Sequence, residues 1–471
     1  MIASVQRLSL WLWDRKVLGI WALPFFIAAL LKFSPFGPLA VVGLVICFLS
    51  ILIPLEKVLY FFPVYVPFHI YLMQLQTAGA GTDSKLGPFT ILGSIKDLLL
   101  IFLVCLWVLK MTTGRKYKLV HTSLNGVLFA FLCLGAIHIL NYYDAAVGFW
   151  GFRNSMEFIV LFYITVSVVQ EPAQVRNLLL AMVYSAIPVL VYGFVQFLNA
   201  RIGYFIGPEV VTLSGRLAGI FGGLSATNVY GVYLMIITIL ALGMLYTQLS
   251  RINRLLTFLV LIGAGFNLLF TFSRRAWIGA VAGMLILSQA ARDRRILAIM
   301  LIGVVAVIIA SPQIVAERFD SIFTSNNASN QGRFHEWRIV ASRVFDNPWS
   351  AIYGMGMGMV GPVSYEFDVP GKIQSHSYYM LLLGQMGVPG LLLFIALVGT
   401  ILVVGLRGLM ARADKEPRIL LAITYSVACA MLVTCFFGIT LDSFPPNFYF
   451  WLDVGLLFAL VRWIETRRME Q

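Results

Sequence analysis

His376 is the histidine that this sequence places best for proton transfer at a membrane surface. It ends the only long hydrophilic stretch of the chain, which also holds His335, and begins a long apolar segment. An imidazole can accept a proton near neutral pH because its ordinary pKa is about 6.5. The three remaining histidines, which we interpret as packing or interfacial residues, are His69, His121 and His138.

A second set of candidates consists of arginines at predicted outward-facing turns: Arg153, Arg201, Arg216, Arg274 and Arg275. A guanidinium group offers a rigid fork of donors to phosphate or pyrophosphate oxygens and stays charged at any working pH. Arg216 is the strongest candidate because it lies in a glycine-rich segment, where backbone amides can also approach an anion. The alternative is that each arginine reaches lipid phosphate or pairs with an acid, as Arg153 can with Glu157.

The composition indicates the class of protein that must position these residues. Of 471 residues, 60% are hydrophobic and 12% are charged, whereas soluble domains carry about 25% charged residues. The net charge of +13 comes from short clusters of Lys and Arg between apolar runs, which is typical of cytoplasmic loops. This distribution excludes nucleic acid as the expected partner. The five cysteines fall inside apolar runs without metal-ligand spacing. We therefore predict an all-α, polytopic integral membrane protein without cofactor or metal.

The apolar runs predict about fourteen (12 to 14) transmembrane helices in a single transmembrane domain, 1 to 471, with both termini in the cytoplasm. The first run has no cleavage site after it and is predicted to be a retained helix. The predicted helices cover 17 to 33, 38 to 55, 57 to 75, 97 to 111, 122 to 140, 156 to 170, 177 to 199, 228 to 249, 255 to 272, 276 to 291, 296 to 311, 377 to 406, 419 to 437 and 446 to 462. The segment 57 to 75 contains Pro63 and Pro67, so a broken or interfacial helix is the alternative there.

One large loop, residues 312 to 376, is predicted on the outer face. Loops of this length are uncommon unless they are functional or disordered. Within it, residues 332 to 346 predict an amphipathic helix. The apolar residues at helical spacing are Phe334, Trp337, Val340 and Val344.

From His376 the chain reads HSYYMLLLGQMGVPGLLLF, which resembles the O-antigen ligase and polymerase family of membrane glycosyltransferases. The family pattern there is close to H-N-x-Y-L-x-x-L-x-E-x-G-x-x-G-L-x-x-F. The matching residues are His376, Tyr379, Leu383, Gly387, Gly390, Leu391 and Phe394. Ser377 stands where the family has Asn and Gln385 where it has Glu, so the hydrogen bonds at those two positions differ.

Three further segments resemble the family in the same order along the chain, so the resemblance covers roughly residues 210 to 400. The first is Arg216 to Phe221 followed by Asn228, without the usual proline before the asparagine. The second is Ser273 to Gly279 with Gly283, similar to S-R-x-A-x-x-G-x-x-x-G. The third is Gly332 to Trp337, similar to G-R-x-x-x-W, followed by Asn347-Pro348 and Gly354-x-Gly356.

The resemblance implies a GT-C-like fold and a glycosyltransferase of the bacterial inner membrane. Such an enzyme transfers a glycan from an undecaprenyl-pyrophosphate carrier to an acceptor sugar on the outer face. Arg216 and Arg333 are then expected to stabilise the pyrophosphate leaving group without a metal, and His376 to activate the acceptor hydroxyl. The alternative is a purely structural role for Arg333, in an ion pair with Glu336. The residues expected to bind substrate are Arg274, Tyr379, Arg153 and Asn228.

Three functions remain open at this stage. A polymerase would extend a lipid-linked repeat unit of an O-antigen, capsule or exopolysaccharide, and is favoured because such polymerases are widespread. A ligase would transfer the glycan to lipid A core. An anion or lipid-glycan transporter is the alternative of another class, although the two halves of the chain show no repeat. Membrane lipids are expected partners, and a polymerase would also work with a flippase and a chain-length regulator.

Overall fold

The computed structural model describes residues 54–79, 91–113, 117–140, 144–202, 226–310 and 328–470. The predicted helices at 17 to 33 and 38 to 55 lie almost entirely outside these ranges, as do residues 312 to 327 of the predicted outer loop. The described residues form helices, turns and one isolated parallel bridge between Val360 and Ile373. No β-strand of greater length occurs among them. The all-α prediction is therefore confirmed for this part of the chain.

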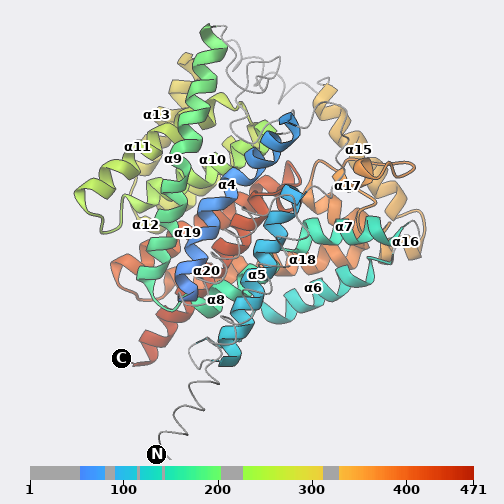
Figure 1. The fold of residues 1–471 in the computed structure, drawn as a ribbon, viewed down its shortest axis with the longest axis horizontal. Coiled ribbons are helices and arrows are strands. Elements are labelled where there is room, and N and C mark those ends of the chain that lie inside the picture. The colour runs from blue at the N-terminus through green and yellow to red at the C-terminus, as the bar shows by residue number, and fades with distance from the viewer. Residues whose placement is uncertain are drawn as a thin grey trace, which may run out of the picture. The chain divides into compact units, whose positions relative to one another are not determined.

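The described helices follow one another in the order shown in Figure 1. They are α4 (Leu55–Gly79), α5 (Ile91–Thr113), α6 (Asn125–Ile137), α7 (Ala145–Met156), α8 (Ile159–Val168), α9 (Pro172–Ile202), α10 (Ala226–Met244), α11 (Arg251–Phe270), α12 (Arg274–Ala291), α13 (Arg295–Ala310), α15 (Ala328–Val344), α16 (Pro348–Tyr353), α17 (Pro362–Glu366), α18 (Tyr378–Met410), α19 (Lys415–Phe436), the 3₁₀ helix η2 (Thr440–Asp442) and α20 (Pro446–Glu470).

Six of the described helices are long and apolar enough to cross a membrane: α9, α10, α11, α18, α19 and α20. A helix needs about 20 mostly apolar residues to do so. A polytopic membrane protein is thus confirmed. The uncertain third segment is one helix, α4, which continues through Pro63 and Pro67 but is not among the six.

The chain divides into two compact units. One contains residues 1–62 and 87–118, and in its described part the Tyr117 hydroxyl donates a short hydrogen bond to the Glu56 carboxylate. The other contains residues 63–86 and 119–471, and every element that bears on the site belongs to it. The sequence had indicated a single transmembrane domain from end to end.

The core of the larger unit is built where α12 packs between α10 and α19. Side chains at Gly279 and Gly283 would collide with Met235 and Ile239 of α10 and with the chain of α19. These glycines belong to the motif that begins at Ser273, and they let three helices approach closely. This packing holds the start of α12, with its two arginines, in a fixed position.

The loop before His376, which is predicted to lie on the outer face, docks on a break in α18. Gly387 has φ 65° and ψ −165°, so the helix loses its regular backbone there. The loop supplies hydrogen bonds at this point, because the amide of Met355 donates to Gly384 O at 2.7 Å and that of Gly356 to Gln385 O at 3.0 Å. The Gln385 side chain donates to Val360 O at 2.8 Å, a bond that the ionised glutamate usual in the family cannot make.

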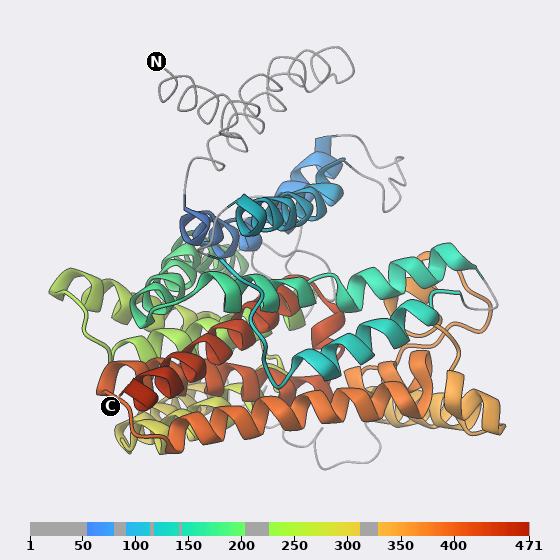
Figure 2. The same ribbon diagram turned by 90° about the horizontal axis from the view of Figure 1, so that it is seen from below.

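The helix predicted within the outer loop is confirmed as α15, which contacts α18. Figure 2 shows α18 as the long orange helix and α15 in lighter orange beside the N-terminal part of α18. Val340 and Val344 are fully buried, as the apolar pattern predicted. The prediction that Phe334 belongs to this buried face is wrong, since 63% of the residue is exposed.

The predicted helix at 156 to 170 corresponds to α8, which begins three residues later and ends two residues earlier. The predicted turn around Arg153 is wrong, because Arg153 lies inside α7 and the helical structure is interrupted only between α7 and α8. The Asp144 carboxylate begins α7 by accepting from the amide of Ala146 at 2.7 Å. At the other end, the Asn447 side chain of α20 donates to Asn154 O at 2.7 Å, which satisfies a carbonyl group at the break.

Replacing Gly387 by alanine is expected to destabilise the protein. Its backbone conformation is unfavourable for other residues, and an added methyl group would collide with the carbonyl oxygens of Ala351 and Ile352. We expect a loss of about 1 to 3 kcal/mol, visible as a lower thermal unfolding temperature in detergent. Gly399→Ala, in the same helix, is the control, because nothing lies within 4 Å of its added methyl group. Equal unfolding temperatures for the two variants would contradict the docking described above.

Candidate active site

His376 occupies the turn immediately before α18. Its φ is 47°, and Ser377 follows in an extended conformation as the N-cap of the helix. The amide of Tyr378 donates to Gly438 O at 3.2 Å, which ties this turn to the segment after α19. The His376 side chain is 47% exposed, so the imidazole remains accessible to a substrate.

Helix α15 presents three side chains toward this turn. The Trp337 indole donates to Ser375 O, one residue before His376. One turn earlier in the helix lies Arg333, and Glu336 places Oε2 3.3 Å from His376 Nε2. Residues three and four positions apart share one face of a helix, so a single docking contact positions all of them. This explains the spacing of the G-R-x-x-x-W motif.

The electrostatics of the cluster favour a neutral imidazole. Burial lowers the pKa of His376 below its ordinary value of 6.5, and the positive charges of Arg333 and Arg275 lower it further. The Glu336 carboxyl group lies close to His376, and burial raises the pKa of Glu336. Near neutral pH, His376 therefore has a free lone pair beside two fixed cations.

Arg275 is a second cation whose charge reaches His376, and it was not among the predicted site residues. It lies in the first turn of α12, and its charge acts on His376 from there. Its guanidinium group packs against Gly438, where any side chain would collide with it. The motif S-R-x-A assigns its arginine to Arg274 and leaves Arg275 at the unspecified position, so the motif carries no signal for Arg275.

A family model for O-antigen ligase matches residues 258–395 of the chain. The chain carries an O-antigen ligase domain. The domain contains Arg275, Arg333 and His376, together with three of the four motif segments recognised in the sequence; the segment from Arg216 to Asn228 precedes it. A search of curated proteins found no match.

Asn228 nevertheless joins the O-antigen ligase domain through a direct contact. The Ser273 hydroxyl donates to Asn228 Oδ1 at 3.0 Å, linking the start of α10 to the residue before α12. Arg274 follows Ser273 in the first turn of α12, and its role in substrate binding stays a prediction. Arg216 lies outside the described residues, as does the side chain of Arg201.

Tyr379 packs within the O-antigen ligase domain between α18 and α19. Its ring stacks on Phe436 with centroids 4.2 Å apart, and its hydroxyl lies 3.5 Å from Leu432 O. The ring is partly buried in this contact. The expected contact of Tyr379 with a sugar stays a prediction, whereas its packing role is clear.

Arg153 lies outside the O-antigen ligase domain, in α7. Its Nε is 3.5 Å from Glu157 Oε2. Its guanidinium carbon lies 4.5 Å from the centre of the Trp150 ring. The predicted pairing with Glu157 is therefore confirmed. Both contacts are with residues in or directly after α7, so they stabilise this part of the chain. A substrate contact of Arg153 stays a prediction.

Asp442 is a buried carboxyl group that the sequence analysis missed. It lies in η2, and the Ser155 hydroxyl donates to its Oδ1 at 2.5 Å. Burial raises the pKa of Asp442 to about 7. Its sequence context, between two apolar helices, gave no sign of a partner 287 positions away in the chain.

Replacing Arg333 by glutamine is expected to raise the pKa of His376, because one of the two cations that lower it is removed. Diethyl pyrocarbonate modifies the neutral imidazole, so its rate at His376, followed by peptide mass spectrometry, reports the pKa. The midpoint should lie below 6.5 in the wild type and shift upward in Arg333→Gln. Arg338→Gln, an exposed position of the same helix, should leave it unchanged. A shift that is equal in both variants would refute the proximity of Arg333 and His376.

Proposed function

We propose that this protein is a membrane glycosyltransferase that moves a glycan from undecaprenyl pyrophosphate to an acceptor sugar at the outer face of the bacterial inner membrane. The observation that carries the proposal is the convergence of His376, Glu336 and two arginines at the start of a membrane-crossing helix in an O-antigen ligase domain. The family and the apolar helices already indicate a multi-pass inner-membrane protein that acts on lipid-linked glycans.

The proposed reaction is one displacement at the anomeric carbon of the donor. The neutral imidazole of His376 accepts the proton of the acceptor hydroxyl, whose oxygen forms the new glycosidic bond. The bond from the anomeric carbon to the pyrophosphate oxygen breaks, and undecaprenyl pyrophosphate leaves with both electrons. Attack from the opposite side inverts the anomeric configuration.

The departing pyrophosphate gains negative charge, and fixed cations stabilise that charge best where water is scarce. Arg333 and Arg275 are the described residues that fit this role, since their charges already reach His376. Arg216 is proposed as a third member from outside the described residues. The matched region has no Asp-x-Asp motif, which supports a metal-independent reaction.

Glu336 is proposed to orient the catalytic imidazole. Oε2 of this carboxylate lies 3.3 Å from Nε2 without forming a hydrogen bond in the structure, and a small rotation of the ring would let it accept the Nε2 hydrogen and favour that tautomer. The lone pair then lies on Nδ1, which would receive the proton from the acceptor. The arrangement accounts for Glu336 better than a simple ion pair with Arg333 does, although the charge of Arg333 also acts on this carboxyl group.

The finer assignment is polymerisation of the repeat units of an O-antigen, capsule or exopolysaccharide. The matched family is described as O-antigen ligase, so transfer to lipid A core is the competing assignment. The proposal includes about fourteen membrane spans in a GT-C-like arrangement, cytoplasmic termini, and a flippase and chain-length regulator as partners.

His376→Ala is expected to reduce glycan transfer by about 10²- to 10⁴-fold, the usual contribution of a general acid or base. Donor binding should persist in that variant, whereas Arg333→Ala should weaken it. Transfer is measured with purified protein and a radiolabelled lipid-linked donor, and Arg338→Ala serves as the matched control. Full transfer by both His376→Ala and Arg333→Ala would remove the basis for this site.

The acceptor distinguishes a polymerase from a ligase. Purified protein is incubated with the labelled donor and either a second lipid-linked repeat unit or lipid A core. We expect elongated lipid-linked chains and no label on the core, resolved by gel electrophoresis. Label on lipid A core alone would reverse the assignment while leaving the transferase mechanism intact.

A further inference from the structure

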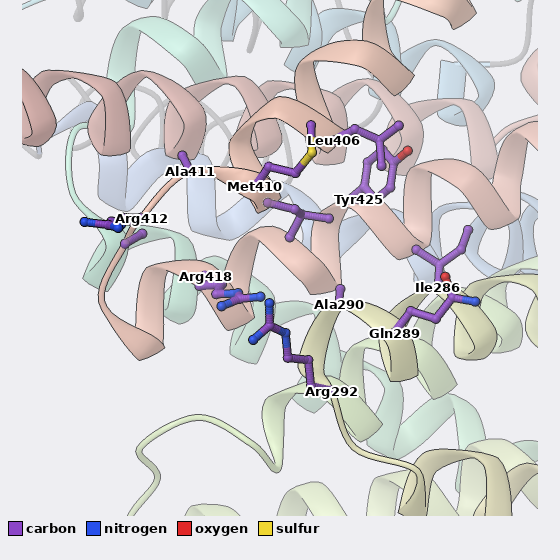
Figure 3. Close-up of a pocket in the computed structure, with 12 residues that line it drawn as sticks. Ile286, Gln289, Ala290, Arg292, Leu406, Met410, Ala411, Arg412, Arg418 and Tyr425 are labelled. Atoms are coloured by element: carbon purple, nitrogen blue, oxygen red, sulfur yellow. The ribbon is translucent and has the colours of Figure 1, made fainter.

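A pocket of about 670 Å³ lies where the C-terminal ends of α12 and α18 meet the start of α19. Three arginines line it: Arg292 at the end of α12, Arg412 between α18 and α19, and Arg418 in α19. Figure 3 shows the guanidinium groups of Arg292 and Arg418 pointing toward one another. We propose that this pocket binds the phosphate headgroup of an anionic membrane phospholipid.

The three cations of the pocket lack acidic partners among the described residues. Two nearby acids are committed elsewhere: Glu416 pairs with Arg176 at 2.7 Å, and the Asp293 carboxylate accepts from the amide of Arg295 at 2.8 Å. A third, Asp414, is exposed and forms no ion pair with these arginines in the described structure. Like charges that converge repel one another unless an anion lies between them. Guanidinium groups bind phosphate through paired, charge-assisted hydrogen bonds, which makes phosphate the anion that fits.

Apart from Gln289 and Tyr425, the remaining wall of the pocket is apolar, and much of it belongs to α18, a candidate membrane span. Ile286, Leu406 and Met410 line it, and Met410 is 77% exposed. Both α18 and α19 are candidate membrane spans, so their adjoining ends lie near a membrane surface. A ligand with an anionic head and an apolar tail matches both parts of this wall, which a soluble phosphate does not.

This pocket is separate from the candidate active site. His376 lies two residues before the start of α18, whereas the pocket lies at the last turn of this 33-residue helix. At about 1.5 Å per residue the two ends are roughly 50 Å apart, more than the thickness of a bilayer core. The same lipid phosphate cannot occupy both sites, so the pocket does not depend on the proposed transfer reaction.

The test compares lipid retention by the full-length protein in native mass spectrometry. Protein in detergent is titrated with cardiolipin, phosphatidylglycerol or zwitterionic phosphatidylethanolamine. The pocket variant carries Arg292→Gln, Arg412→Gln and Arg418→Gln. The matched control carries Arg251→Gln, Arg254→Gln and Arg468→Gln, three exposed arginines outside the pocket that give the same change of charge.

We expect the wild type and the control to prefer the anionic lipids, and the pocket variant to bind them at least about tenfold more weakly, as the loss of one charged hydrogen bond already predicts. Equal binding by all three proteins, or equal loss in both variants, would overturn the proposal. So would full displacement of the lipid by millimolar inorganic phosphate, which would identify a soluble ligand. If the triple variant does not fold, Arg292→Gln with Arg418→Gln gives the same comparison.

Discussion

The docking of the outer loop on α18 is the contact on which the candidate active site depends. Backbone groups inside a membrane protein need hydrogen-bond partners, and α18 loses its own near Gly387. The amides of Met355 and Gly356 supply replacements. The loop is thereby held against the helix that His376 begins, and α15 arrives at a fixed distance from the imidazole. These backbone hydrogen bonds between the loop and α18 therefore help to fix the position of the charged side chains of α15.

The second constraint is electrostatic. Two arginines beside an imidazole favour its neutral form, and the proposed reaction uses the same arginines to stabilise the departing phosphate group. In that proposal, one arrangement of charge serves both proton acceptance and leaving-group stabilisation. Glu336 supplies the one carboxyl group that contacts the imidazole in the described cluster, and burial raises its pKa.

Much of the fold could be predicted from the sequence because it depends on local patterns. Long apolar runs indicated the membrane helices, and helical spacing of apolar residues indicated α15. The position of His376 at the start of a helix followed from the same change in pattern. These features depend on residues that are close together in the sequence, and the periodicity of apolar residues indicates them directly.

The contacts that complete the site could not be predicted, because they join residues far apart in the chain. Glu336 was expected to pair with Arg333 on its own helix, yet it also contacts His376, 40 positions later. The break between α7 and α8 depends on Asn447, 293 positions from the carbonyl that it satisfies. Asp442 likewise gains its environment only in the folded chain.

The Trp337 hydrogen bond has a mechanical consequence. Because the indole donates to the carbonyl of Ser375, a displacement of α15 would be transmitted to the turn that carries His376. In the proposed reaction, an anion that binds Arg333 would therefore act on the imidazole through the shared helix. Engagement of the carrier and orientation of the base would then be mechanically linked.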